Sequence, residues 1–132
     1  MRGNDQHELM IQALKDAFEK KGFLTETQVH VRDGNFVGFV DLFIEDKTGA
    51  KLCVEVEQDI KRISNDYVKK ELTAALLWIV VPTASIQETA RRFIRLIELP
   101  ENESFKILTY GQALSMVANL IPFSFQALRE EK

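Results

Sequence analysis

The 132-residue chain has the size of one domain, and its 45% hydrophobic and 28% charged residues are typical of a globular protein. The longest apolar run, AALLWIVVP at residues 74–82, is far shorter than the roughly 20 residues of a membrane-spanning helix. The net charge of −3 excludes a protein that coats nucleic acid through bulk positive charge. We therefore expect a single domain over residues 1–132, without a membrane segment.

The cellular compartment is indicated by two features of the sequence. No basic-then-apolar leader opens the chain, so we expect no signal peptide. Cys53 is the single cysteine, so it cannot form an internal disulfide, and with no histidine base near it we interpret it as a packing residue. A cytoplasmic protein is the resulting expectation.

The first half of the chain predicts a helix followed by three strands. Residues 6–21 carry apolar side chains at helical spacing, and a glycine follows where a helix would end. Residues 22–46 predict two strands joined by a tight turn at Asp33 and Gly34. A second turn leads to a third strand at residues 51–57, so we expect three antiparallel strands behind the helix.

The second half alternates helices with short apolar strands. The expected elements are helix 59–75, strand 76–82, helix 85–99, strand 104–110 and helix 111–121, followed by a tail at 122–132 that docks or frays. The apolar residues expected on the inward face of helix 59–75 are Ile60, Ile63, Tyr67, Val68 and Leu72. The order αβββαβαβα predicts an α/β fold, with a mixed central sheet flanked by helices on both sides.

Three carboxylates interrupt this apolar pattern. Glu55 and Glu57 point to the same face of strand 51–57, about 7 Å apart along it. Asp41 lies within an apolar strand, where aspartate is disfavoured, and the short turn between the two strands can place it beside Glu55. Two or three converging carboxylates suit a hard divalent cation such as Mg²⁺ or Mn²⁺. A half-exposed strand with a polar face is the alternative reading of the two glutamates.

This arrangement resembles the PD-(D/E)xK nuclease superfamily, which includes Holliday-junction resolvases and many restriction endonucleases. The resemblance covers residues 6–82 in element order, with Asp41 followed fourteen residues later by Glu55-Val56-Glu57. Valine precedes Asp41 where the family has proline, and Glu57 stands where the family has its catalytic lysine. Some restriction enzymes of this superfamily carry Glu-x-Glu and remain active.

The resemblance implies a set of site residues. Asp41, Glu55 and Glu57 would hold Mg²⁺ or Mn²⁺, with Glu57 as a ligand or as the base that orients a water molecule. Glu8, in the first helix, is the best match to an acidic residue that assists at the metal site of resolvase-like members. The missing lysine can be supplied from helix 59–75, by Lys61, which lies closer to the strand end, or by Lys69. The two histidines, His7 and His30, lack a cysteine or histidine at ligand spacing, which argues against zinc.

The resemblance implies a small metal-dependent endonuclease that hydrolyses phosphodiester bonds in DNA, in repair, recombination, restriction or a mobile element. A domain of this size has little surface for gripping a duplex, so we expect a homodimer. One alternative is a catalytically degenerate nuclease fold that acts as a DNA- or protein-binding module, which the acidic net charge and Glu57 both favour. A second alternative is a protein-interaction α/β domain outside this superfamily.

Overall fold

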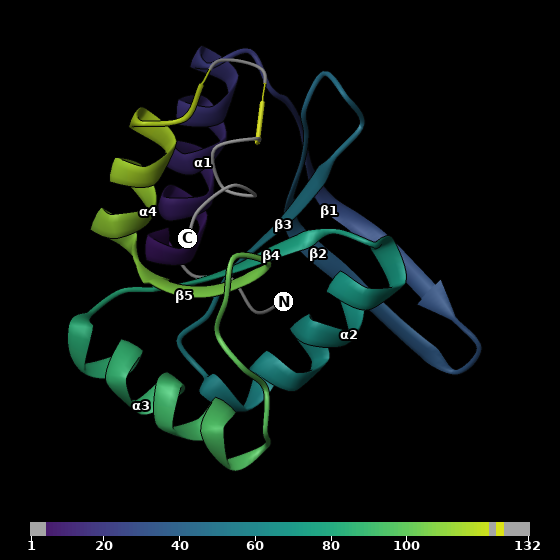
Figure 1. Cartoon of the computed structure of the whole chain (residues 1–132), viewed down its shortest axis with the longest axis vertical. Helices are drawn as coiled ribbons and strands as arrows, with labels where there is room; N and C mark the ends of the chain where they lie inside the picture. The colour runs from purple at the N-terminus through teal and green to yellow at the C-terminus, as the bar shows by residue number, and fades with distance from the viewer. Residues whose placement is uncertain (1–4, 122–123, 126–132) are drawn as a thin grey trace.

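The structure of the chain is a computed structural model that describes residues 5–121 and 124–125, and it confirms the predicted element order (Figure 1). The elements are α1 (Asp5–Lys20), β1 (Leu24–Asp33), β2 (Phe36–Glu45), β3 (Lys51–Val56), the short 3₁₀-helix η1 (Ile60–Arg62), α2 (Ile63–Thr73), β4 (Leu76–Val81), α3 (Ala84–Leu96), β5 (Phe105–Thr109) and α4 (Tyr110–Ala118). Within the described residues, no helix has both the length and the apolar character needed to cross a membrane.

The five strands form one mixed sheet in the order β1-β2-β3-β4-β5. The first three strands pair antiparallel, as their short turns require, whereas β3, β4 and β5 pair parallel through helical crossovers. All six residues of β4 are buried, because helices cover both faces of this central strand and its sequence is apolar throughout. The sheet therefore changes from antiparallel to parallel at β3, the strand that carries Glu55 and ends directly before Glu57.

Helices cover both faces of the sheet. On one face, α1 and α4 pack over an apolar cluster that includes Phe18, Leu42, Val54 and Trp78. On the other face, α2 and α3 pack over a second cluster that includes Cys53. The alternation expected for β3 is confirmed, because Leu52, Val54 and Val56 belong to the first cluster while Cys53 belongs to the second.

The expected inward face of α2 is wrong in part. Val68 and Leu72 are exposed, whereas Asp66, Lys69 and Lys70 are buried. The physical reason differs for each: Lys69 pairs with Glu55 on the sheet that α2 covers, Asp66 pairs with Lys69, and the ammonium group of Lys70 lies over the Tyr67 ring. The apolar spacing of the sequence could not show this, because the surface that the helix covers is itself charged.

Part of the tail docks on the turn between β2 and β3. Asp46 accepts hydrogen bonds from the backbone N–H groups of Thr48, Ala50 and Phe125, and the ring of Phe125 stacks on that of Phe23. Residues 122–123 and 126–132 of the predicted tail lie outside the described residues.

Candidate metal centre

Asp41 lies where strands β2 and β3 separate. The last pair of this ladder is Leu42 with Val54, and beyond it side chains replace the backbone pairing. The N–H of Asp41 donates to Glu55 Oε1 at 3.3 Å, and the N–H of Val56 donates to Asp41 Oδ2 at 2.9 Å. An aspartate in an apolar strand is explained in this way, because its carboxylate satisfies a buried backbone donor. Asp41 and Glu55 consequently lie side by side.

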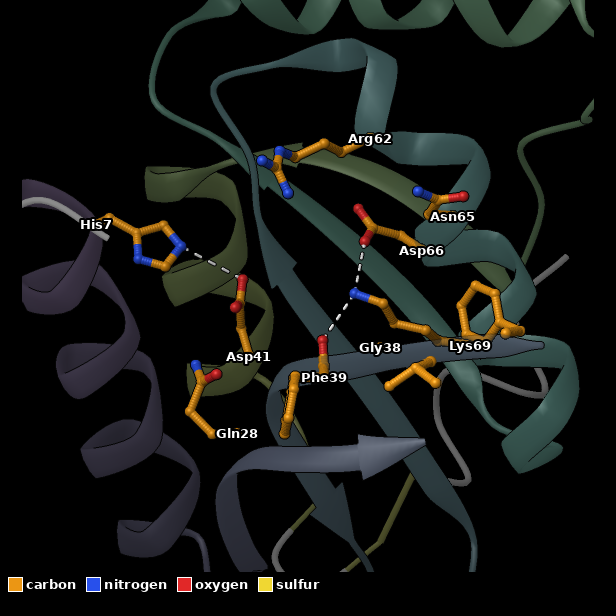
Figure 2. Close-up of a pocket in the computed structure, with 11 residues that line it drawn as sticks. His7, Gln28, Gly38, Phe39, Asp41, Arg62, Asn65, Asp66 and Lys69 are labelled. Carbon is orange, nitrogen blue, oxygen red and sulfur yellow. Dashed lines mark hydrogen bonds and ion pairs between the residues drawn. The ribbon is translucent and has the colours of Figure 1, made fainter. Parts of the chain in front are cut away.

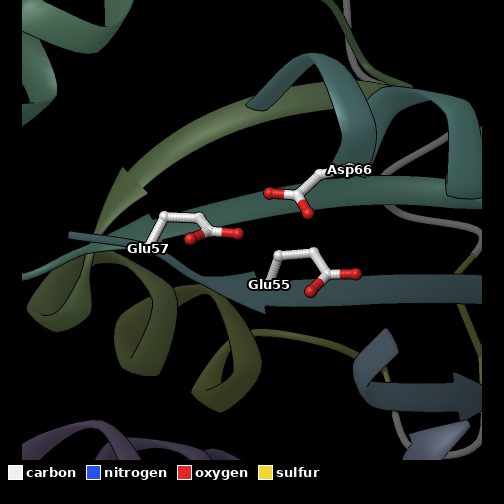
Figure 3. A group of neighbouring side chains, drawn as sticks. All are labelled: Glu55, Glu57 and Asp66. Atoms are coloured by element: carbon white, nitrogen blue, oxygen red, sulfur yellow. The ribbon is translucent and has the colours of Figure 1, made fainter. Parts of the chain in front are cut away.

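A group of three buried carboxylates lies next to this pair. Glu55 comes from the end of β3, Glu57 follows that strand directly and Asp66 comes from α2 (Figure 3). Their ligand atoms lie within 4.8 Å of one another. Each residue is at most 1% exposed. Asp66 Oδ2 receives no hydrogen bond from any described residue. A buried carboxylate oxygen without a donor is costly, and a bound cation would offset that cost.

Lys69, one turn after Asp66 on α2, holds its ammonium group among these carboxylates. Its Nζ donates to Phe39 O at 2.7 Å and to Asp66 Oδ1 at 3.2 Å (Figure 2). It also donates to Glu55 Oε2 at 3.5 Å. Gly38 leaves room for the lysine stem, because a Cβ there would lie 3.1 Å from Lys69 Cε. The fold thus brings a buried lysine to the carboxylates from the helix that follows β3.

The electrostatics of this cluster favour a bound cation. Burial, and then repulsion by Asp66 and Asp41, raise the pKa of Glu55 well above its ordinary value, although Lys69 opposes the shift. Burial alone would lower the pKa of Lys69, but attraction to Glu55 and Asp66 outweighs it and the pKa is raised. Lys69 is therefore a protonated donor at neutral pH and does not act as a base.

His7, near the start of α1, lies beside Asp41 and lines the same cavity as Lys69. Its Nε2 lies 3.4 Å from Asp41 Oδ2, and its Nδ1 lies 3.2 Å from Glu8 Oε2. His7, Asp41, Asp66 and Lys69 line one cavity of about 470 Å³, whose wall also includes Arg62. His7 was not predicted for this site because its partner is an aspartate 34 positions away, which no local ligand spacing reveals.

The remaining predicted site residues lie outside the carboxylate group. The side chain of Glu8 is 63% exposed and contacts His7, and Lys61 is exposed at the start of η1, where its backbone N–H donates to Asp59. Cys53 is buried, and burial raises the pKa of its thiol to about 12, which agrees with a packing role and not with a nucleophile.

The group Glu55, Glu57 and Asp66 fits a hard divalent cation. All the donor atoms are carboxylate oxygens, which Mg²⁺ and Mn²⁺ prefer, and one of them has no hydrogen-bond donor in the described part of the chain. Asp41, the predicted ligand from β2, is not among these three carboxylates: its backbone N–H donates to Glu55, and its own carboxylate accepts from the N–H of Val56. A divalent charge would also relieve the repulsion between these carboxylates.

The raised pKa of Glu55 predicts a pH-dependent stability for the metal-free protein. Between the ordinary Glu pKa of 4.5 and the raised folded value, the folded state holds a proton that the unfolded chain has lost. The free energy of unfolding in EDTA should therefore fall as pH rises above about 4.5. Urea unfolding of the wild type and of Glu55→Gln measures this dependence. The free energy of unfolding of Glu55→Gln minus that of the wild type should increase with pH. A difference in the free energy of unfolding that does not change with pH would contradict the raised pKa of Glu55.

Comparisons with known proteins bear on the fold alone. No family model matches the sequence, and no curated protein matches it. The fold is similar to the crystal structure of AF1548, a protein of unknown function, with a TM-score of 0.52 and 16% sequence identity. The match covers 91% of this chain and 64% of that chain, so this chain spans less than two thirds of AF1548. It supports the αβββαβαβα architecture.

Proposed function

We propose that the chain is a metal-dependent nuclease of the PD-(D/E)xK type, which hydrolyses phosphodiester bonds in DNA. The observation that carries the proposal is the buried group of Glu55, Glu57 and Asp66, with an Asp66 oxygen that no described residue satisfies, beside a protonated lysine. Groups of opposite charge held together in a cavity are the arrangement that phosphoryl chemistry uses.

The carboxylates and Lys69 have separate roles in this proposal. Glu55, Glu57 and Asp66 would hold Mg²⁺ or Mn²⁺, with Asp41 beside them, and the bound cation would act as a Lewis acid that lowers the pKa of a water molecule. The positive charge of Lys69, whose N–H groups are held by Phe39, Asp66 and Glu55, would stabilise the negative charge that develops on the scissile phosphate. His7 would hold the Asp41 carboxylate in place through the 3.4 Å contact.

Lys69 supports the resemblance to PD-(D/E)xK nucleases despite the Glu-x-Glu motif. Glu57 occupies the sequence position of the family lysine, but an ammonium group lies 3.5 Å from Glu55 all the same. Between the two helix lysines considered from the sequence, the geometry favours Lys69 over Lys61, whose side chain is exposed. Because the lysine is supplied by α2, position 57 can carry a third carboxylate.

The partner and setting of this activity are also proposals. We propose DNA as the substrate, and we infer a homodimer that places two sites on two strands, which sedimentation equilibrium would test. The buried thiol of Cys53 is compatible with a reducing, cytoplasmic setting. The binding-module alternative keeps the fold but needs no cation.

A cleavage assay with a parallel binding measurement tests the proposal. The wild type should bind Mn²⁺ in a calorimetric titration, nick supercoiled plasmid and a branched junction with Mg²⁺ or Mn²⁺, and be inactive in EDTA. Asp41→Asn and Glu55→Gln should lose cleavage by at least about 100-fold and weaken Mn²⁺ binding, because each removes a carboxylate charge.

The matched control for this assay is Glu88→Gln, which removes the same charge from an exposed position on α3 and should match the wild type. Absence of both cleavage and Mn²⁺ binding in the wild type would reject the nuclease. DNA binding that persists under those conditions would instead support the binding module.

A further inference from the structure

An exposed aromatic side chain lies next to the candidate metal centre. Phe39 is 49% exposed, belongs to neither apolar cluster, and lies two residues before Asp41 on β2. The backbone oxygen of Phe39 accepts the 2.7 Å hydrogen bond from Lys69, which fixes the Phe39 backbone next to the ammonium group (Figure 2). His30, the residue of β1 that pairs with Phe39, packs against it with a distance of 5.0 Å between the two ring centroids.

The Phe39 ring is presented on the outer face of the β1–β2 hairpin. Gly38 faces Lys69, because a Cβ at Gly38 would lie 3.1 Å from Lys69 Cε, and successive strand residues point to opposite faces. Phe39 and Val37 therefore share the other face, where Val37 is 53% exposed. Together with His30, they form an apolar and aromatic surface that adjoins the cavity, and we call these three residues the hairpin platform.

The rest of the cavity wall has the chemistry of a nucleotide site. Arg62 and Lys69 supply positive charge for a phosphate, and the side-chain amides of Asn65 and Gln28 supply paired donors and acceptors of the kind that read the edges of bases. An aromatic ring at the rim supplies a stacking surface for the flat face of a base. A cavity of about 470 Å³ accommodates a small ligand or a nucleotide unit, not the full width of a duplex.

We infer that the hairpin platform stacks an unpaired DNA base next to the scissile phosphate, so that the substrate of this site is single-stranded or branched DNA and not continuous duplex. The inference rests on the proposed nuclease function. It follows from the position of Phe39, whose backbone touches Lys69 while its ring is open to solvent. A base paired within a duplex has both of its faces covered by its neighbours and cannot occupy the platform.

Fluorescence anisotropy in EDTA separates this inference from the proposed function, because it measures binding without cleavage. The wild type should bind a labelled single-stranded 20-mer more tightly than the matching duplex. Phe39→Ala should weaken single-strand binding by about tenfold or more. Phe39→Trp should restore it, with protein fluorescence that is quenched on binding. Leu24→Ala, which truncates another exposed apolar residue of the hairpin, should match the wild type.

The possible outcomes have distinct meanings. Single-strand binding that depends on Phe39, without metal-dependent cleavage, would keep the platform and reject the nuclease. Metal-dependent cleavage with equal single-strand affinities for the wild type and Phe39→Ala would keep the nuclease and reject the platform. A third outcome is that the wild type sediments as a dimer and Phe39→Ala as a monomer, while both bind DNA equally well. This result would assign the hairpin platform to contact with a second copy of the chain and overturn the inference.

Discussion

Lys69→Met should reduce metal-dependent DNA cleavage by about 10²- to 10³-fold, the size of effect seen when a single donor to transition-state charge is removed. Mn²⁺ binding should persist or tighten, because the variant removes a positive charge that competes with the cation for Glu55 and Asp66. Single-turnover cleavage and calorimetry measure the two effects separately. A lysine whose charge stabilises the phosphate in the transition state predicts this split, whereas a purely structural lysine predicts that both properties decline together.

Control variants are needed because Lys69 belongs to a buried ion pair. Removing one partner of such a pair destabilises a protein by roughly 3–5 kcal/mol, so circular dichroism must show that Lys69→Met is folded under assay conditions. Lys69→Arg keeps the charge and provides a second variant, which should remain folded and retain more activity than Lys69→Met. Lys61→Met alters the exposed lysine at the start of η1 and should cleave like the wild type. Equal losses in Lys61→Met and Lys69→Met would contradict the assignment.

The fold was predictable from the sequence because its signals are local. The Asp33–Gly34 turn, the apolar run that became β4 and the helical spacing of residues 6–21 each depend on neighbouring residues alone. The position of Asp41 was predictable for a related reason. A charged residue in an apolar strand requires a partner, and the short turn between β2 and β3 limits which partner it can reach.

The other half of the site was not predictable, because it depends on how α2 lies against the sheet. Asp66 and Lys69 fall between apolar residues whose spacing predicts a different inward face. Lys69 becomes buried because it pairs with Glu55 on the sheet beneath it, and Asp66 is buried beside it as the second partner of the same ammonium group, while Val68 and Leu72 stay exposed. A run of polar residues on a helix is ordinarily a solvated face, so only the tertiary structure distinguishes this one.

Asp66→Asn tests whether the carboxylate that sequence reasoning missed is a metal ligand. The amide keeps the size of the side chain and can still accept the hydrogen bond from Lys69 through its oxygen, but it removes the charge that the buried Oδ2 carries. Mn²⁺ affinity should fall by about 100-fold, since even partners outside the ligand sphere cost 10- to 100-fold. The metal-free protein should lose little stability, because the weaker contact with Lys69 is offset by the loss of one source of repulsion from Glu55, which still pairs with Lys69.

Asp59→Asn is the matched control for this change, because it makes the same substitution seven residues earlier at an exposed position that caps η1. Its Mn²⁺ affinity should equal that of the wild type. If Asp66→Asn also binds Mn²⁺ like the wild type, then Asp66 serves only to hold Lys69, and the cation would be left to Glu55, Glu57 and Asp41. If the Mn²⁺ affinity of Asp66→Asn falls while its free energy of unfolding in EDTA is unchanged, the bound cation is what offsets the cost of burying the Asp66 carboxylate. The two results therefore decide between a lysine clamp and a metal ligand.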